Sequence, residues 1–387
     1  MTMIPKIRFS EFEEEWKKVK LYNYATRITR KNTKLESNLP LTISSIDGLV
    51  SQIDYFNNRV ASQNISGYYL IKNGEYAYNK SYSNGYPWGS VKRLDKYDMG
   101  VLSTLYIVFS INDSIDSDYF SHFFDTNLWH REVATKAEEG ARNHGLLNIS
   151  VEDFFDINIS TPTLSEQRRI SHFFTLLDET IRLEGERLLS LKQVKAASLQ
   201  SFFPQEGEKE PRVRFKGFSG EWKKVRLGEI EIESGSVLNS KDFIPGNIPV
   251  IAGGMKPAGY HKYSNREGNV ITISASGANA GFVSYYETPI FASDCSTISE
   301  QKDIDTKFLF YAITLHQKEI FKCQAGGAQP HVHAKDIKDI KIVLPTLAEQ
   351  CALSTYFTNI DEQIRLVSEK IEKMKKVKGA CLEGMMV

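Results

Sequence analysis

Two stretches of the chain place apolar residues at alternating steps of three and four, the spacing of one face of an α-helix. The first stripe consists of Ile170, Phe174, Leu177, Ile181, Leu188 and Leu191, and the second of Leu353, Phe357, Ile360, Ile364, Val367, Ile371 and Met374. Glu184 interrupts the first stripe where the second has Val367. A stripe this narrow, sustained through about three heptads, is typical of a coiled-coil seam. We therefore predict two long helices that pair with each other. The alternative is two unconnected amphipathic helices, each packed on its own domain.

Both helices are predicted to begin at the same motif. Thr163-Leu-Ser-Glu166 and Thr346-Leu-Ala-Glu349 fit a capping box, in which the Thr caps the helix and the Glu bonds back to the cap. A helix from about Glu166 to Gln200 would be roughly 50 Å long at 1.5 Å of rise per residue.

The remainder of each half alternates β-branched and aromatic runs with turn residues, which is typical of short strands. The predicted strands are Tyr68–Ile71, Tyr76–Tyr78, Leu102–Phe109, Ile248–Ile251, Val270–Ile273 and Ala280–Tyr286. The predicted helices in these regions are Asp118–Arg131 and Asp305–Phe321. The pattern therefore predicts an α+β fold in which each half has a mainly antiparallel sheet with helices.

The chain also repeats itself at both ends of each half. Residues 5–21 return at residues 211–227, an offset of 206, and residues 153–167 return at residues 336–350, an offset of 183. Matching ends around unlike middles indicate two copies of one scaffold that present different surfaces. The predicted organisation is a first domain at 1–161, a long helix at 162–203, a polar, proline-bounded linker at 204–211, a second domain at 212–344 and a second long helix at 345–387.

The composition is that of a globular protein, with a quarter of the residues charged and a formal net charge of zero. Long-range electrostatics therefore cannot draw the whole molecule onto a polyanion, and any nucleic-acid contact must use local basic stripes or partner subunits. The four cysteines contain no C-x-x-C pair, which favours reduced, structural thiols. No segment has the apolar run of a signal peptide or a membrane span, so we expect a cytoplasmic protein.

Signatures of catalysis are missing from the sequence. There is no phosphate-binding G-x-x-x-x-G-K-[ST] loop, and no Pro-Pro pair of the kind that adenine methyltransferases carry. His331-Val-His333 offers half of a metal site without a recognisable third ligand. We therefore expect no catalytic residues and no bound metal in this chain.

Two turn-rich stretches, residues 76–93 and 256–266, interleave aromatic, amide and basic side chains. Lys and Arg can neutralise phosphates, and Arg, Asn and Gln can read base edges in the major groove. The alternative is an ordinary solvated loop with core tyrosines. The candidate DNA-contacting residues are Lys80, Tyr82, Asn84, Lys92, Arg93, Tyr260, Lys262, Asn265, Arg266, Ser276 and Asn279.

Taken in order and in duplicate, these motifs resemble the specificity subunit of type I restriction-modification systems over essentially the whole chain. The matching segments are Phe9–Val19 with Phe215–Val225, Pro162–Arg182 with Pro345–Arg365, Tyr78–Thr104, Thr272–Val283 and Ile290–Thr297. Glu184, opposite Val367 in the second copy, departs from the repeat and puts the continuity of the seam in doubt there.

The resemblance implies two target-recognition domains, each reading one half of a bipartite, asymmetric DNA site. The helices would pair antiparallel, set the spacer between the half-sites and dock two modification (methyltransferase) subunits. Two restriction-translocation subunits would join through the complex. The resemblance also implies that this chain binds no cofactor, because the partners use S-adenosylmethionine, ATP and Mg²⁺.

Two other classes of function stay open at this point. One is a tandem-repeat methyltransferase or nuclease with an unrecognised signature, which methyl transfer by the purified chain alone would establish. The other is a tandem module that binds something other than DNA, such as a polysaccharide. Salt separates DNA binding from sugar binding, because phosphate neutralisation releases counterions and sugar binding does not.

Overall fold

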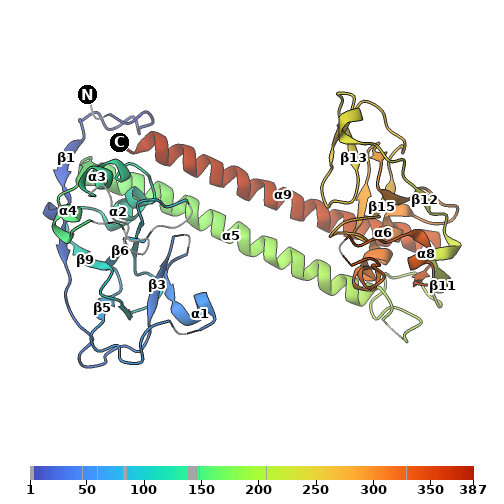
Figure 1. The fold of residues 1–387 in the computed structure, drawn as a ribbon, viewed down its shortest axis with the longest axis horizontal. Helices are drawn as coiled ribbons and strands as arrows, with labels where there is room; N and C mark the ends of the chain where they lie inside the picture. Colours follow the sequence, from blue (N-terminus) through green and yellow to red (C-terminus); the bar gives the residue numbers. More distant parts are fainter. Residues whose placement is uncertain are drawn as a thin grey trace. The chain divides into compact units, whose positions relative to one another are not determined.

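The computed structural model describes residues 4–45, 47–58, 60–81, 85–137, 147, 149–205, 207–327 and 329–387. It divides into two compact units (Figure 1). Unit 1 comprises residues 1–185 and 370–387, and unit 2 comprises residues 186–369. Each unit is α+β with mainly antiparallel sheets, as the sequence predicts. In the described part of the chain, no helix has the length and apolar character needed to cross a membrane.

Unit 1 is built from short strands and helices that precede one long helix. Its elements are β1 (Lys17–Lys20), η1 (Leu21–Asn23), β2 (Ala25–Arg27), β3 (Leu41–Ser44), β4 (Gly48–Ser51), α1 (Gln52–Phe56), β5 (Tyr69–Lys72), β6 (Tyr76–Asn79), β7 (Ser90–Arg93), β8 (Met99–Leu102), β9 (Ile107–Ile111), α2 (Ser117–Phe124), α3 (His130–Lys136), α4 (Val151–Phe155), β10 (Asn158–Thr161) and the start of α5 (Leu164–Phe202). The main sheet has the order β2-β9-β6-β7, and β3-β4 and β5-β8 form separate pairs.

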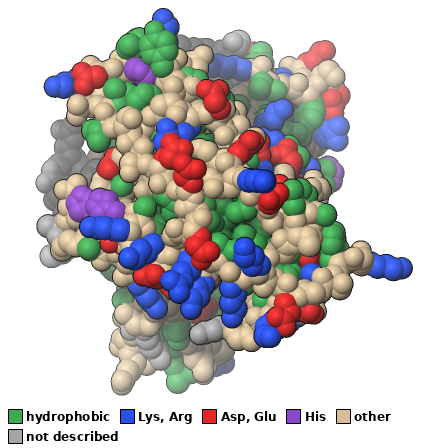
Figure 2. All heavy atoms as spheres, turned by 90° about the vertical axis from the view of Figure 1, so that its right-hand side faces the viewer, with side chains coloured by type: hydrophobic (Ala, Val, Ile, Leu, Met, Phe, Trp, Pro, Cys, Tyr) green, Lys and Arg blue, Asp and Glu red, His purple; other side chains and the backbone are tan. Residues whose placement is uncertain are grey.

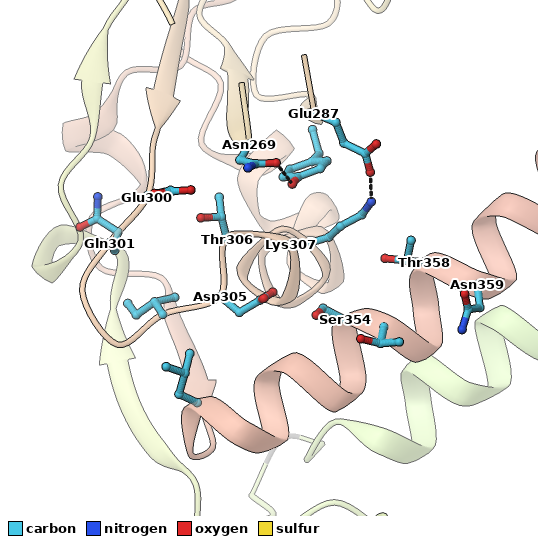
Figure 3. Close-up of a pocket in the computed structure, with 14 residues that line it drawn as sticks. Asn269, Glu287, Glu300, Gln301, Asp305, Thr306, Lys307, Ser354, Thr358 and Asn359 are labelled. Carbon is cyan, nitrogen blue, oxygen red and sulfur yellow. Dashed lines mark hydrogen bonds and ion pairs between the residues drawn. The ribbon is translucent and has the colours of Figure 1, made fainter. Parts of the chain in front are cut away.

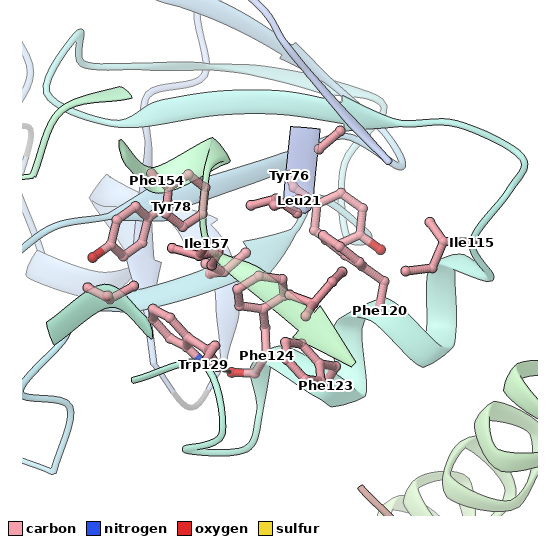
Figure 4. Packing of buried hydrophobic residues seen from close by; sticks show 14 of the residues in the cluster. Leu21, Tyr76, Tyr78, Ile115, Phe120, Phe123, Phe124, Trp129, Phe154 and Ile157 are labelled. Carbon is pink, nitrogen blue, oxygen red and sulfur yellow. Dashed lines mark hydrogen bonds between the residues drawn. The ribbon is translucent and has the colours of Figure 1, made fainter. Parts of the chain in front are cut away.

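The main core of unit 1 is unusually rich in aromatic rings (Figure 4). Tyr76 and Tyr78 of β6 are fully buried in it, and Tyr78 stacks on Phe154 with ring centroids 4.4 Å apart. The Tyr76 hydroxyl bonds to Ser117 at the start of α2, and the Tyr78 hydroxyl donates to the carbonyl of Trp88. Each hydroxyl therefore has a partner, as a buried phenol requires. A second core lies under β3, β5 and β8.

Unit 2 repeats the plan with a different middle. Its elements are β11 (Lys223–Arg226), η3 (Leu227–Glu229), β12 (Glu233–Ser234), η4 (Ser240–Asp242), β13 (Ile248–Ile251), β14 (Gly259–His261), β15 (Val270–Ser274), β16 (Val283–Tyr286), β17 (Phe291–Ala292), β18 (Cys295–Ile298), α6 (Thr306–Leu315), α7 (Gln317–Lys322), α8 (Ala334–Ile337), β19 (Lys341–Leu344) and most of α9 (Leu347–Met385). The main sheet has the order β12-β18-β15-β16, and the smaller sheet has the order β14-β13-β17, with β13 and β17 parallel.

Three predicted elements differ from the structure in their extent. The predicted strand Leu102–Phe109 is two strands, β8 and β9, because a turn closes with Tyr106 N–H donating to the Ser103 carbonyl. The predicted helices Asp118–Arg131 and Asp305–Phe321 are each two helices, α2 with α3 and α6 with α7. In both cases a tight turn, at Asp125 and at His316, redirects the chain between them.

The repeated ends of each half pair with one another. In unit 1, β1 and β10 form an antiparallel sheet with Val19 opposite Ile159. In unit 2, β11 and β19 pair in the same register, with Val225 opposite Ile342. The sequence offsets of 206 and 183 therefore map one sheet onto the other. We call this sheet and the long helix that follows it the scaffold of each unit.

A buried ion pair fastens the N-terminal segment of each unit to its long helix. The Arg8 guanidinium holds both oxygens of Glu166 at 2.8 Å, and Arg214 holds both oxygens of Glu349 at 2.7 Å. Of the two hydrogen bonds of the capping box predicted at the first helix, the one from the Thr163 side chain is confirmed and the one from the Glu166 side chain is wrong. Thr163 Oγ1 does accept from the Glu166 N–H at 3.4 Å, but the Glu166 carboxylate binds Arg8 instead of the cap.

The glutamine after each of these glutamates hydrogen-bonds the long helix to the N-terminus of an earlier helix in the same unit. Gln167 accepts from the backbone N–H of Asp116, the N-cap of α2, at 2.8 Å. Gln350 accepts from the backbone N–H of Asp305, the N-cap of α6, at 2.9 Å. Both glutamines are buried, so the Glu-Gln pair of the repeat has a structural role in both units.

Antiparallel pairing of α5 with α9 is confirmed within each unit. Polar contacts between the helices include Asp178–Lys378 (2.6 Å) and Glu184–Lys370 (2.5 Å) in unit 1, and Lys195–Asp361 (2.5 Å) and Ser198–Tyr356 (2.9 Å) in unit 2. With the offset of 183, Asp178 corresponds to Asp361, and Lys195 corresponds to Lys378. The Asp178–Lys378 ion pair of unit 1 therefore recurs in unit 2 as Lys195–Asp361.

All thirteen residues of the two predicted stripes are buried or half-buried. Ile170 and Phe174 belong to the core of unit 1, and Leu353 and Phe357 to the core of unit 2. The first turns of each helix therefore pack on the core of their own unit, which is what the alternative of separately packed helices predicts. Glu184, which breaks the first stripe, is largely buried beside α9 through its pair with Lys370.

Candidate nucleic-acid interface

Exposed aromatic and basic side chains of unit 2 lie on and around the β13–β14 hairpin. The smaller sheet β14-β13-β17 packs on its own apolar cluster of Ile251, Val270, Ile290, Ala292 and Cys295. Burial in this cluster raises the pKa of the Cys295 thiol to about 12, so that cysteine is a packed, neutral side chain. The hairpin therefore stands on a support separate from the main core.

The hairpin exposes large apolar side chains next to cations. Tyr260 is 59 % and Tyr263 55 % exposed, and the Lys262 ammonium lies 5.4 Å from the centroid of the Tyr263 ring. Met255 is 57 % exposed and precedes Lys256, which is also exposed. We call these five residues the hairpin surface. Exposed rings beside lysines that make no ion pair with any residue the structure describes suit contact with a phosphate backbone and base or sugar edges.

Three of the other candidates in unit 2 point inward. Asn265 both donates to the Ala292 carbonyl and accepts from the Ala292 N–H, so its amide braces the smaller sheet. Arg266 pairs with Glu233 at 2.9 Å, and its side chain is only 14 % exposed. The Ser276 hydroxyl donates to the Asp294 carboxylate.

The backbone of Asn279 accepts from the Phe282 N–H in a tight turn, and its side chain is half-buried. DNA contact by Asn279 and by the inward-pointing side chains stays a prediction.

In unit 1 the predicted stretch serves mostly the interior. Lys92 pairs with Asp125 at 2.6 Å. Arg93 pairs with Asp95 and Asp118, and although burial opposes its charge, Tyr76 and these carboxylates raise its pKa. The Lys80 ammonium donates to the Ile149 carbonyl at 3.2 Å. Tyr82 and Asn84 lie outside the described residues. The structure thus places Lys80, Lys92 and Arg93 in internal contacts, and their contact with DNA stays a prediction.

Sequence reasoning passed over a second exposed aromatic surface in unit 1. Helix α1 exposes Ile53, Tyr55 and Phe56 at 51 %, 50 % and 44 %, and the two rings meet edge to face at 4.8 Å. Ser51 caps this helix by accepting from the Asp54 N–H. The signal was present in the sequence as three large apolar residues within a polar run.

A polar pocket beside α9 is unsuited to a polyanion (Figure 3). It has a volume of about 580 Å³ and carries the carboxylates of Glu287, Glu300 and Asp305. Lys307 pairs with Glu287, and the Asp305 carboxylate caps α6 by accepting from the Phe308 N–H. Its acidic lining would repel phosphate groups.

The histidine pair that suggested half a metal site has no further ligands around it among the described residues. The rings of His331 and His333 lie parallel with centroids 6.1 Å apart. Within the part of the chain that the structure describes, no group of three or more His, Cys, Asp or Glu side chains is arranged to hold a metal ion.

Comparison with known proteins gives the family. The model of the type I restriction modification DNA specificity domain matches residues 13–193 and 219–376. The type I restriction enzyme MjaVIII specificity subunit of Methanocaldococcus jannaschii is 24 % identical over 311 residues, which is 72 % of each chain. A putative type I specificity subunit of Mycoplasma pneumoniae is 27 % identical over 163 residues, 41 % of this chain and 43 % of the relative.

Solved structures agree on the fold. The S subunit of a type I restriction-modification system from M. genitalium has a TM-score of 0.69 at 16 % identity, covering 100 % of this chain and 99 % of that one. A chain from a study of complex assembly and conformational transition of a type I R-M system has a TM-score of 0.54 at 18 % identity, covering 97 % and 98 %. With the family model matched in both halves, this chain belongs to the family of type I restriction-modification DNA specificity proteins.

Proposed function

We propose that this chain is the DNA-specificity subunit of a type I restriction-modification complex and is not itself catalytic. One observation carries the proposal. The two units share one scaffold, with the same strand register and the same buried Arg–Glu pair, but the regions between the scaffold strands differ. A structural repeat with different exposed surfaces suits reading two different half-sites. Unit 1 would read one half of a bipartite, asymmetric DNA site, and unit 2 the other.

The long helices would then set the spacer and receive partner subunits. Two modification subunits would dock along α5 and α9, whose outer faces still expose large apolar side chains such as Leu183, Leu189 and Leu366, at 50 %, 58 % and 50 %. Two restriction-translocation subunits would join through the complex. The partners would bring S-adenosylmethionine, ATP and Mg²⁺, and the complex would act in the cytoplasm, where DNA is accessible.

In unit 2 the hairpin surface is the part best suited to DNA. Its rings are exposed and its lysines make no ion pair among the described residues. In unit 1 the equivalent role would fall to α1 and neighbouring loops, because Tyr76 and Tyr78 are core residues.

Copurification and methylation test this function together. The tagged full chain, expressed with the other subunits of its system, should retain a methyltransferase subunit at two copies per chain. The complex should methylate adenine within one bipartite sequence, and omission of this chain should abolish methylation. Methyl transfer by the chain alone, or an unchanged methylated sequence without it, would contradict the proposal.

A further inference from the structure

Unit 2 carries a groove that is lined by lysines and is separate from the hairpin surface. The groove has a volume of about 850 Å³ and lies between α7, the β11–β19 sheet and the segment after α5. Its cations are Lys224, Lys318, Lys322 and Lys341, all exposed. We call this the lysine groove. On the face shown in Figure 2, Lys and Arg side chains gather in the lower half, on the side where Figure 1 labels β11 and α8.

Within the described residues, the four lysines outnumber the carboxylates that line the same groove. None of these lysines makes an ion pair with a residue that the structure describes, although the groove also contains Glu208, Glu319 and Asp339. Glu208 pairs with Arg212 at 2.9 Å, and Glu319 lies 2.9 Å from the ring of His316. Four more exposed cations, also without an ion pair in the described part of the chain, stand on the same elements or next to them, namely Lys223, Arg226, Lys335 and Lys338. Clustered like charges destabilise a fold, so their presence needs another reason.

Unit 1 provides an internal control, because it builds the same scaffold without this charge. Lys18 stands at the position of Lys224, but it pairs with Glu132 of α3 at 2.9 Å. Asn158 stands at the position of Lys341, and its side chain donates to the same carboxylate at 2.7 Å. The scaffold therefore folds with these positions neutralised.

In unit 2, Glu319 is the counterpart of Glu132, because it precedes the buried Ile320 as Glu132 precedes the buried Val133. Glu319 contacts His316 instead of a lysine, and Lys341 stands where unit 1 has the neutral amide of Asn158. The excess positive charge is thus a property of unit 2 and not of the repeat.

We propose that the lysine groove binds the phosphate backbone of duplex DNA without regard to sequence, in addition to the half-site that unit 2 reads. The inference rests on the proposed function and deepens it. Lysine is a flexible point charge that suits phosphates, and it is depleted in protein–protein interfaces. Among the described residues, no Phe, Tyr or Trp lines the groove, and these are the rings on which single strands stack. A duplex backbone therefore fits better than an acidic protein or a single strand.

Salt dependence of duplex binding tests the inference. The complex containing the full chain is titrated with a random-sequence duplex at several salt concentrations, beside a variant with Lys224, Lys318, Lys322 and Lys341 replaced by Ala. Each phosphate that the protein no longer neutralises lowers the slope of log K against log salt by about 0.9. We expect the slope to fall by about two to four, with the methylated sequence unchanged, because the substitutions remove no base contact.

A smaller matched pair of variants controls for charge. Lys224→Ala with Lys318→Ala should lower the slope by about two. Lys18→Ala with Arg131→Ala, which removes the same charge from the equivalent positions of unit 1, should leave it nearly unchanged. Circular dichroism melts of both should match the parent, because all four side chains are at the surface.

The outcomes separate the inference from the proposed function. A parent complex that binds no duplex overturns both. A parent that binds duplex, with a quadruple variant of equal slope, overturns the lysine groove alone. A variant that keeps its slope but loses a partner subunit during purification shows a protein-docking surface, which also overturns the inference.

Discussion

At the scale of single residues, Arg8 and Arg214 have the clearest structural role. Each fastens an N-terminal segment to a glutamate that is almost fully buried, at 1 % exposure for Glu166 and 2 % for Glu349. Each arginine has a raised pKa, chiefly because its side chain hydrogen-bonds to the glutamate. A carboxylate buried this deeply is tolerable only with its cation in place.

We predict that Arg214→Met lowers the free energy of unfolding by about 3 kcal/mol, the lower end of the range for breaking a buried pair, since Arg214 is itself 14 % exposed. The double variant Arg214→Met/Glu349→Met should lose less, because no unpaired charge is left behind. Urea denaturation measures both. Lys209→Met, which breaks an exposed pair with Glu221, is the control and should have little effect. A double variant less stable than the single one would contradict this account.

His122 should make the stability of unit 1 sensitive to pH. It is 8 % exposed, its Nδ1 has no partner among the described residues, and burial, followed by the charge of Lys378, lowers its pKa below the ordinary 6.5. Below about pH 6.5 the unfolded chain takes up a proton that the folded chain does not, so stability falls as the pH falls.

Thermal melts at pH 7.5 and 5.5 should therefore show a larger loss for the parent than for His122→Phe, whose ring cannot titrate. The difference between the two is at most about 1.4 kcal/mol per pH unit, the limit for one proton. His130, whose pKa burial also lowers, titrates in both proteins and cancels. Equal losses in the two proteins would rule out His122 as the origin.

Lys262 and Arg266 should separate affinity from stability. Lys262→Ala removes an exposed cation, so it should weaken binding to every duplex and lower the salt slope by about one. Arg266→Ala removes the partner of Glu233 and of the Thr297 hydroxyl, so it should lower the melting temperature, which Lys262→Ala should not do. Binding titrations and melts on both variants decide. Unchanged binding by Lys262→Ala would take this residue out of the interface.

At the scale of elements, periodicity predicted the long helices well because a helix buries one narrow stripe whatever it packs against. It could not say what covers each turn. Phe174 and Phe357 join unit cores, while Ile181 and Ile364 lie in the middle of the paired helices. For a related reason, composition could not tell whether the tyrosines of residues 76–93 face the core or the solvent. Alternating aromatics show a strand, but not which of its faces is buried, and in β6 the tyrosines fill the core.

The short elements were the hardest to predict. The strands β3 and β4 and helix α1 lie between residues 41 and 56, where Ser, Asp and Gly interrupt every run. They are held by tertiary contacts, such as Leu41 and Leu49 in the second core of unit 1, which no local pattern reveals.

The ion pairs along α5 and α9 sharpen a test of the helices as a spacer. Lengthening α5 alone would shift Lys195 away from Asp361, so both helices must grow together. We predict that one extra heptad after Leu191 and one after Gln363 keeps the seam in phase. Each adds roughly 10 Å of rise, so the spacer should lengthen by about three base pairs, with both half-sites kept.

Mapping methylated adenines measures the spacer of this double insertion. The single insertion after Leu191 is the matched control, and it should reduce stability because it moves the contacts between the helices out of register. An active double insertion with the original spacer would show that α5 and α9 do not set it.

At the scale of the whole molecule, the account rests on two copies of one scaffold carrying independent middles. The scaffold is what the repeats in the sequence specified, through the β1–β10 and β11–β19 sheets and the buried Arg–Glu pairs. The middle regions have no such repeat, so the repeats do not indicate which of their side chains are exposed. In the structure, the hairpin surface and α1 expose large apolar side chains.

The most direct test of independent readout replaces residues 228–335 with the corresponding region of another specificity subunit, leaving both scaffolds intact. The methylated sequence is then mapped in DNA from cells that express the variant with its partner subunits. We predict that one half of the bipartite sequence changes, while the other half and the spacer stay as in the parent. A change in both halves, or in neither, would contradict the account.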